Sequence, residues 1–176
     1  MGITIHYAFM IRDRDAVLQV LKEIKDIAVK LKMKIVDDSE MSLVVHPHPN
    51  SETINLEFKT WIEVKQKKEF DYCKATLQDY EKVLDDKNFV CSDFTKTQYA
   101  GYKTHILVAE MLRRVASRCT LAYVSDEADY YETRNIDKTA KNFDESSKMI
   151  GMIASMLKET FGKDSVYCAI DNTEES

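Results

Sequence analysis

The chain has little of several residue types that often mark a function. It contains four cysteines, four glycines and two prolines in 176 residues. Its cysteines, Cys73, Cys91, Cys119 and Cys168, form no CxxC pair, which predicts free thiols in a reducing cytoplasm rather than a zinc site. No run of about 18 apolar residues occurs, so no membrane-spanning helix is expected. Met1–His6 lacks a basic segment followed by an apolar run, so no signal peptide is expected.

The sequence also lacks the common catalytic and nucleotide-binding motifs. It has no GxGxxG or GxxxxGK[ST] loop, no Gly-x-Ser-x-Gly elbow and no recognisable Cys–His nucleophile pattern. A net charge of −5 argues against a general binder of nucleic acid or of an anionic membrane, because both require a basic face. A small-molecule or anionic ligand remains a partner that this composition allows.

The hydrophobic pattern predicts one α+β domain over residues 1–170 and a disordered acidic tail at 171–176. The expected elements are connected both by hairpins and by helical crossovers. This combination predicts a single mixed β-sheet with about three helices packed mainly on one face. Helices are expected at about 14–32, where Asp13 is the expected N-cap, and at 75–86, 102–118 and 135–161. Strands are expected at 3–9, 34–38, 42–46, 54–58, 89–94, 121–124 and 166–170.

The last of these helices is long, and Asn135 is its expected N-cap. Its apolar stripe runs for about seven turns, ~39 Å, which is longer than a sheet of ordinary strands can cover. One end is therefore expected to meet a second subunit in a homodimer, with Met152 and Met156 near the contact.

Chemistry-bearing residues gather in three clusters, each at the expected end of a strand. The first is His46-Pro47-His48-Pro49. Side chains two positions apart in an extended segment point the same way, so two imidazoles in this arrangement can ligate one metal ion. The alternative is a proline-ended edge strand with two partly exposed histidines.

The second cluster runs from Lys96 to Gly101 and is followed by His105. It precedes a helix, whose free N–H groups can hold an anion with help from Lys96 or Lys103. The alternative is a loop in which Gly101 permits an unusual turn, a threonine at 97 or 104 caps the helix, and His105 is a half-buried core residue.

The third cluster, Ser125 to Thr133, contains four carboxylates and the pair Tyr130-Tyr131. Close carboxylates can share a proton or bind a hard cation. The alternative is an acidic loop that complements the N-terminus of the next helix. The strands before the second and third clusters should be parallel because a helix connects them, so both clusters are expected at one rim of the sheet.

In this order, the three clusters resemble a family of small conserved proteins of uncharacterised function. Its members are similar to this chain at Met1–Ile5, at His-Pro-His-Pro, at Lys-Thr-Gln-[Phe/Tyr]-Ala-Gly with a following histidine, and at Asp-Glu-Gly-x-Tyr-x-Glu-Thr. The chain departs from the last motif at Ala128, where the family has glycine, so a turn there is expected to differ. The resemblance implies a shared site and supplies no reaction.

The leading hypothesis is a cytosolic protein that binds a small ligand or a metal ion. A hydrolase with a site of histidine and carboxylate side chains is the activity considered for it. His48, His105 and Glu127 are the candidate catalytic residues, because histidine titrates near neutral pH and a carboxylate can activate water. The candidate ligand-binding residues are Lys96, Gly101 and Tyr131, and the candidate ligands of a divalent metal are His46, His48 and Glu132. The alternative is a protein-interaction module of the immunity or adaptor type, with its acidic charge and the tyrosine pair at the interface.

Overall fold

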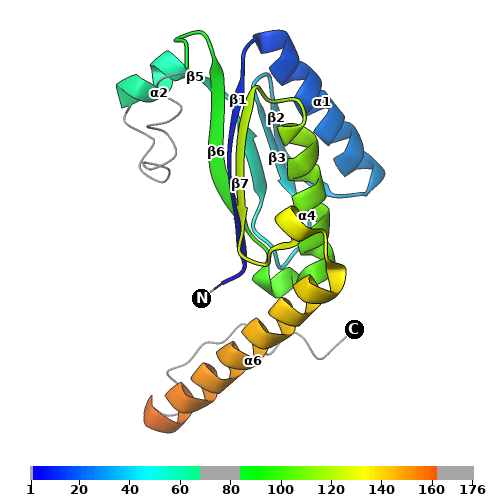
Figure 1. The fold of residues 1–176 in the computed structure, drawn as a ribbon, viewed down its shortest axis with the longest axis vertical. Coiled ribbons are helices and arrows are strands. Elements are labelled where there is room, and N and C mark those ends of the chain that lie inside the picture. Colours follow the sequence, from blue (N-terminus) through cyan, green and yellow to red (C-terminus); the bar gives the residue numbers. More distant parts are fainter. Residues whose placement is uncertain (1, 68–83, 162–176) are drawn as a thin grey trace.

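The computed structural model describes residues 2–67 and 84–161, and they form the predicted α+β fold (Figure 1). Most of the predicted helix at 75–86 lies outside the described residues. The predicted strand at 166–170 and the predicted tail at 171–176 lie wholly outside them. The strands are β1 (Thr4–Ile11), β2 (Lys34–Ser39), β3 (Ser42–His46), β4 (Ile54–Glu57), β5 (Lys59–Thr60), β6 (Phe89–Lys96) and β7 (Leu121–Asp126). The helices are α1 (Arg14–Lys30), α2 (Trp61–Lys67), α4 (Gly101–Ala116), α5 (Tyr130–Thr133) and α6 (Ile136–Phe161), with a 3-10 turn, η2 (Gln98–Ala100).

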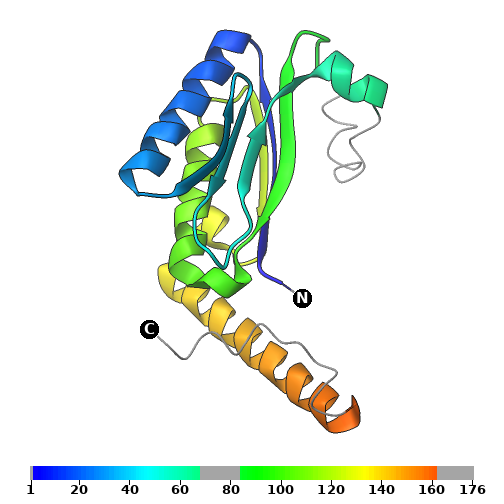
Figure 2. The same ribbon diagram turned by 180° about the vertical axis from the view of Figure 1, so that it is seen from behind.

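The strands form two antiparallel sheets where the sequence predicted one mixed sheet. One sheet has the order β5-β6-β1-β7, and the other has the order β2-β3-β4. Short turns connect β2, β3 and β4, so these strands pair with one another and lie behind β1 in Figure 1; Figure 2 shows them from the other side. The chain then passes from β4 into β5, which joins the first sheet beside β6.

The main hydrophobic core lies between the sheets and the helices α1 and α4. β1 contributes alternate residues, Ile5, Tyr7, Phe9 and Ile11, all at most 2% exposed. The Tyr7 hydroxyl accepts a hydrogen bond from the Asn55 N–H at 3.0 Å and donates one to the Asn55 carbonyl at 3.2 Å, which ties the two sheets together. Burial raises the pKa of Tyr7 above its ordinary value, so this hydroxyl stays protonated.

Helix starts follow the predicted capping residues in two cases. Asp13 accepts a hydrogen bond from the Ala16 N–H at 2.8 Å and caps α1. Asn135 accepts one from the Lys138 N–H at 2.9 Å and caps α6. α2 covers part of the other face of the first sheet, where Trp61 packs with Met10 and Val90.

α6 runs away from the two sheets, as Figures 1 and 2 both show. Its first turns are anchored by Thr139 and Phe143, which are 0% and 5% exposed. Farther along, its apolar side chains are exposed: Met149 by 49%, Met152 by 67% and Ile153 by 49%. Across residues 2–67 and 84–161, no helix is both long enough and apolar enough to cross a membrane.

Candidate functional site

Two of the three clusters lie at one rim of the first sheet. β6 and β7 are both antiparallel to β1, so they run parallel to each other on its two sides. Lys96, the last residue of β6, lies opposite Thr4, and Asp126, the last residue of β7, lies opposite Ile5. The prediction that a helical crossover brings these strand ends to the same rim is therefore confirmed, although β1 separates the two strands.

His105 occupies the centre of this rim. The first turn of α4 places its side chain in the interior, where it is 0% exposed. Its Nδ1 lies 2.7 Å from the Thr97 hydroxyl oxygen, and its Nε2 lies 2.9 Å from Oδ1 of Asp126. The second distance is that of an ion pair, but the Nε2–H bond is not aimed closely enough at the oxygen to count as a hydrogen bond. The Phe143 ring meets the imidazole edge-on at 5.2 Å between centroids. We call Thr97, His105 and Asp126 the buried relay.

Asp126 is held by the loop that follows β7. Its Oδ1 accepts a hydrogen bond from the Ala128 N–H and its Oδ2 accepts one from the Tyr131 N–H, both at 2.8 Å. Burial alone would raise the pKa of Asp126, but the contact with His105 and these two N–H groups outweigh it, so the pKa lies below its ordinary value. Asp126 is thus a carboxylate at neutral pH.

A charged Asp126 decides which imidazole nitrogen carries the proton of a neutral His105. A lone pair on Nε2 would face the carboxylate at 2.9 Å and be repelled, so the proton belongs on Nε2. Nδ1 is then the acceptor for the Thr97 hydroxyl proton. The arrangement can accept a proton from a hydroxyl group and stabilise the resulting imidazolium, which is the acid–base function of hydrolase triads.

Polar groups that are suited to a ligand lie beside the relay on the loop after β6. Gln98 is 7% exposed, and its Nε2 has no hydrogen-bond partner among the described residues. The Lys96 ammonium lies 5.9 Å from the centre of the Tyr99 ring. A Cβ at Gly2 would clash with Cε of Lys96 and lie 2.7 Å from Oε1 of Gln98, so the chain approaches both side chains closely there.

The start of α4 departs from the predicted capping. Within the described residues, no side chain caps this helix, and the Thr97 hydroxyl is engaged by His105 instead. Gly101 has a φ of +82°, so the interpretation that it permits an unusual turn is confirmed. The uncapped N–H groups at the start of α4 lie at the same end of the sheet as the Lys96 side chain. The sequence predicted that these groups together bind an anion.

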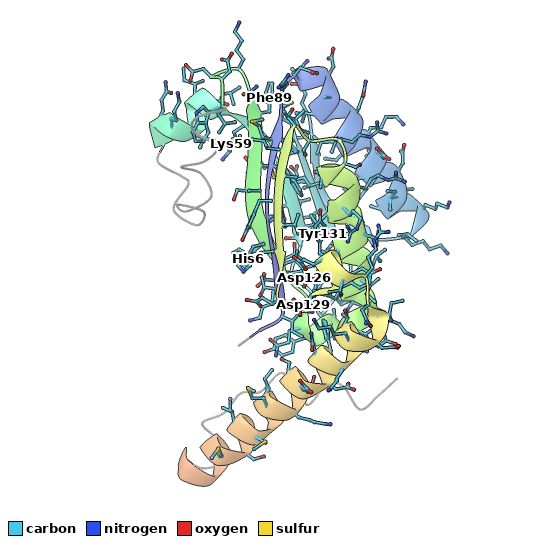
Figure 3. The ribbon with its side chains drawn as sticks, in the orientation of Figure 1. His6, Lys59, Phe89, Asp126, Asp129 and Tyr131 are labelled. Carbon is cyan, nitrogen blue, oxygen red and sulfur yellow. The ribbon has the colours of Figure 1, made fainter. Side chains whose placement is uncertain are left out.

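The third cluster contributes mainly through Asp126, which was not among the predicted site residues. Glu127 accepts a hydrogen bond from the Thr4 N–H at 2.9 Å and so holds the start of β1. Glu132 is exposed on α5. Tyr131 is half-buried, with the Arg113 guanidinium 4.3 Å from the centre of its ring. Figure 3 shows Asp126, Asp129 and Tyr131 toward the end of the first sheet from which α6 leaves, whereas Phe89 and Lys59 lie toward its other end.

The resembled motif has glycine where this chain has Ala128, and the structure shows the backbone conformation of this position. Ala128 is fully buried and does not have a positive φ. The left-handed residue of this loop is its neighbour Asp129, with a φ of 63°. Glycine at position 128 is therefore not required by the backbone of this chain.

His46 and His48 make local contacts in the turn between β3 and β4. Nε2 of His46 lies 2.9 Å from the Ser51 carbonyl oxygen, and Nδ1 of His48 accepts a hydrogen bond from the Asn50 N–H at 3.1 Å. The turn adjoins the rim, because the Glu52 N–H donates to the Lys96 carbonyl at 2.9 Å. Residues 2–67 and 84–161 contain no group of three or more His, Cys, Asp or Glu side chains that could hold a metal ion. The structure thus does not bring His46, His48 and Glu132 together as a three-ligand metal site.

The sequence pattern did not predict Thr97 and Phe143 as partners of His105, or Asp126 as the carboxylate facing it. Asp126 is the last residue of a strand parallel to β6, and this position was the available signal. No protein-family model, curated protein or solved structure matches this chain significantly. The family resemblance stated from the motifs therefore stays a prediction.

Proposed function

We propose that this protein binds a small anionic ligand at the rim and hydrolyses it with the buried relay. The observation that carries the proposal is the continuous path from the Thr97 hydroxyl through His105 to Asp126, with separations of 2.7 and 2.9 Å. Three buried polar side chains of this kind are expensive to desolvate unless they satisfy one another. The hydroxyl on one side of His105 and the carboxylate 2.9 Å away on the other support His105 as a general base whose imidazolium Asp126 would stabilise.

In this proposal, Lys96, the uncapped start of α4 and the unpartnered amide of Gln98 bind the anionic group. As the Thr97 hydroxyl oxygen attacks the acyl or phosphoryl centre, His105 accepts its proton and passes it to the leaving group, whose bond to that centre breaks. Asp126 stabilises the imidazolium that forms, and water, deprotonated by His105, then cleaves the bond to Thr97 and restores the hydroxyl. Thr97 and His105 are both fully buried, so the reaction requires local opening that admits the ligand.

The test is hydrolysis of p-nitrophenyl acetate and p-nitrophenyl phosphate by the purified protein and four variants. Thr97→Ser keeps a hydroxyl and should keep activity, whereas Thr97→Val and His105→Gln should abolish it. His6→Gln removes a half-buried histidine of β1 outside the relay and should leave activity unchanged. Thermal unfolding of each variant separates loss of chemistry from loss of fold. Equal activity in Thr97→Ser and Thr97→Val would overturn the proposal.

A second candidate function is protein interaction through α6. It is favoured by the exposed apolar side chains at Met149, Met152 and Ile153 on a helix that leaves the body of the fold. The tyrosine pair no longer supports it, because Tyr130 is 7% exposed. Sedimentation of wild type against Met152→Glu tests the homodimer form of this candidate. A dimer that the glutamate dissociates supports it, and two monomers at high concentration contradict it.

A further inference from the structure

A second site candidate lies away from the buried relay, in a groove along α4. The groove has a volume of about 450 Å³, within the range of small-molecule sites. Its apolar surface comes from Ile27 of α1 and from Leu107 and Met111 of α4. Its charged surface comes from Glu110, Arg113, Arg114 and Arg134. We call it the arginine groove.

The arginine groove is basic in an acidic chain. Three guanidinium groups and one carboxylate line it, whereas the chain as a whole carries −5. Arg114 also pairs at 3.1 Å with Glu23 beside the groove, which Arg118 contacts at 3.3 Å, so four arginines exceed two carboxylates here by two positive charges. Arg113 and Arg134 share the one carboxylate, Glu110, with nitrogen–oxygen distances of 3.6 Å in each case. Those distances are too long for hydrogen bonds, so the carboxylate attracts both guanidinium groups without occupying their donors.

Arg113 is held in place before any ligand arrives. Its guanidinium stacks 4.3 Å from the centre of the Tyr131 ring and donates a hydrogen bond to the Tyr131 carbonyl. Its Nε is buried and, among the described residues, has no hydrogen-bond acceptor. A guanidinium that is already ordered loses little side-chain entropy when it binds an anion.

Dipole compensation alone does not explain this cluster. Arg113 and Arg114 lie in the last turn of α4, where cations balance the helix dipole. Arg134, however, comes from the junction of α5 and α6 and reaches the groove from a left-handed backbone conformation, with a φ of 53°. Such a conformation is uncommon for a residue other than glycine.

We propose that the arginine groove binds a small organic molecule carrying a doubly charged phosphate group. Guanidinium groups match phosphate oxygens in pairs, and a charge of −2 balances the surplus of the groove. Ile27, Leu107 and Met111 cover the organic part of the ligand. The proposal does not depend on hydrolysis at the buried relay, because it uses different residues.

The experiment is calorimetric titration of the full chain with phenyl phosphate, with benzoate as the singly charged comparison. Arg134→Gln and Arg114→Gln are the test variants; both side chains are more than half exposed, so the fold should tolerate them. Arg12→Gln removes the same charge from an exposed position outside the groove. Thermal unfolding verifies that all variants are folded.

Phenyl phosphate should bind wild type saturably, and each groove variant should weaken it by about tenfold or more, the effect of losing a charge-assisted hydrogen-bond pair. Arg12→Gln should bind like wild type. Three results would overturn the proposal: no saturable binding, equal weakening in Arg134→Gln and Arg12→Gln, or benzoate binding as tight as phenyl phosphate.

Discussion

Nε2 of His105 lies 2.9 Å from Oδ1 of Asp126, and both side chains are completely buried. One residue comes from the first turn of α4 and the other from the last position of β7, so the contact joins the two ends of a helical crossover. The Thr97 hydroxyl continues the path from the other side of the imidazole. The contact therefore ties the start of α4 to the end of β7 at the rim.

Asp126→Asn should lower the free energy of unfolding by about 2–4 kcal/mol. The amide replaces one acceptor oxygen by an NH₂ group, so either the Ala128 or the Tyr131 N–H loses its acceptor. Urea unfolding measures the loss. Asp144→Asn, at an exposed position of α6, is the matched control and should change the value by less than about 0.5 kcal/mol.

Stability should fall in acid partly because of Asp126. Its pKa in the folded protein is lower than in the unfolded chain, so the charged form favours folding. This contribution is complete above the unfolded pKa of about 4 and disappears as the pH falls through the folded pKa. Urea unfolding from about pH 6 to pH 2 should therefore show a shallower acid dependence for Asp126→Asn than for wild type. Parallel curves would contradict the assignment.

Two positions of α6 should respond very differently to substitution. Phe143 is 5% exposed and packs against His105, so Phe143→Ala should cost about 3 kcal/mol or more. Met152 is 67% exposed, so Met152→Ala should stay within about 0.5 kcal/mol of wild type. Similar losses at both positions would show that the far part of α6 is also packed.

Cys91 and Cys119 should react slowly with thiol reagents. Burial raises the pKa of Cys119 to about 12, and burial also raises that of Cys91 above its ordinary value. The thiolate is the nucleophile, so little of the reactive form exists at pH 8. In a Cys73→Ser/Cys168→Ser variant, dithionitrobenzoate should label the buried Cys91 only after denaturant is added and the half-buried Cys119 slowly. Rapid labelling of two thiols without denaturant would contradict the burial of Cys91.

Much of the fold could be predicted from local patterns. Alternation in β1, the Asp13 cap and the Asn135 cap identified their elements, because each signal depends on neighbouring residues only. The division into two sheets could not be predicted, because it depends on β4 continuing into β5 and pairing there with β6. Strand order is a long-range property, and hydrophobic period does not encode it.

The candidate site was predicted in part, for the same reason. The crossover rule correctly placed Lys96 and Asp126 at one rim. The rule does not predict which of the four carboxylates in the third cluster faces His105. That depends on where β7 ends and on which side chain its register directs toward His105. The histidine pair at 46 and 48 fitted a metal pattern, but the tight turn uses both rings in local contacts.

The most direct test is ¹⁵N NMR of the His105 imidazole in wild type and Asp126→Asn. The central claim is that Asp126 keeps the proton on Nε2 and leaves Nδ1 facing the Thr97 hydroxyl. Wild type should show a protonated Nε2 whose hydrogen exchanges slowly, and an unprotonated Nδ1 that accepts a hydrogen bond. Asp126→Asn should lose this preference. A wild-type ring with the proton on Nδ1, or one that exchanges as fast as an exposed histidine, would contradict the claim.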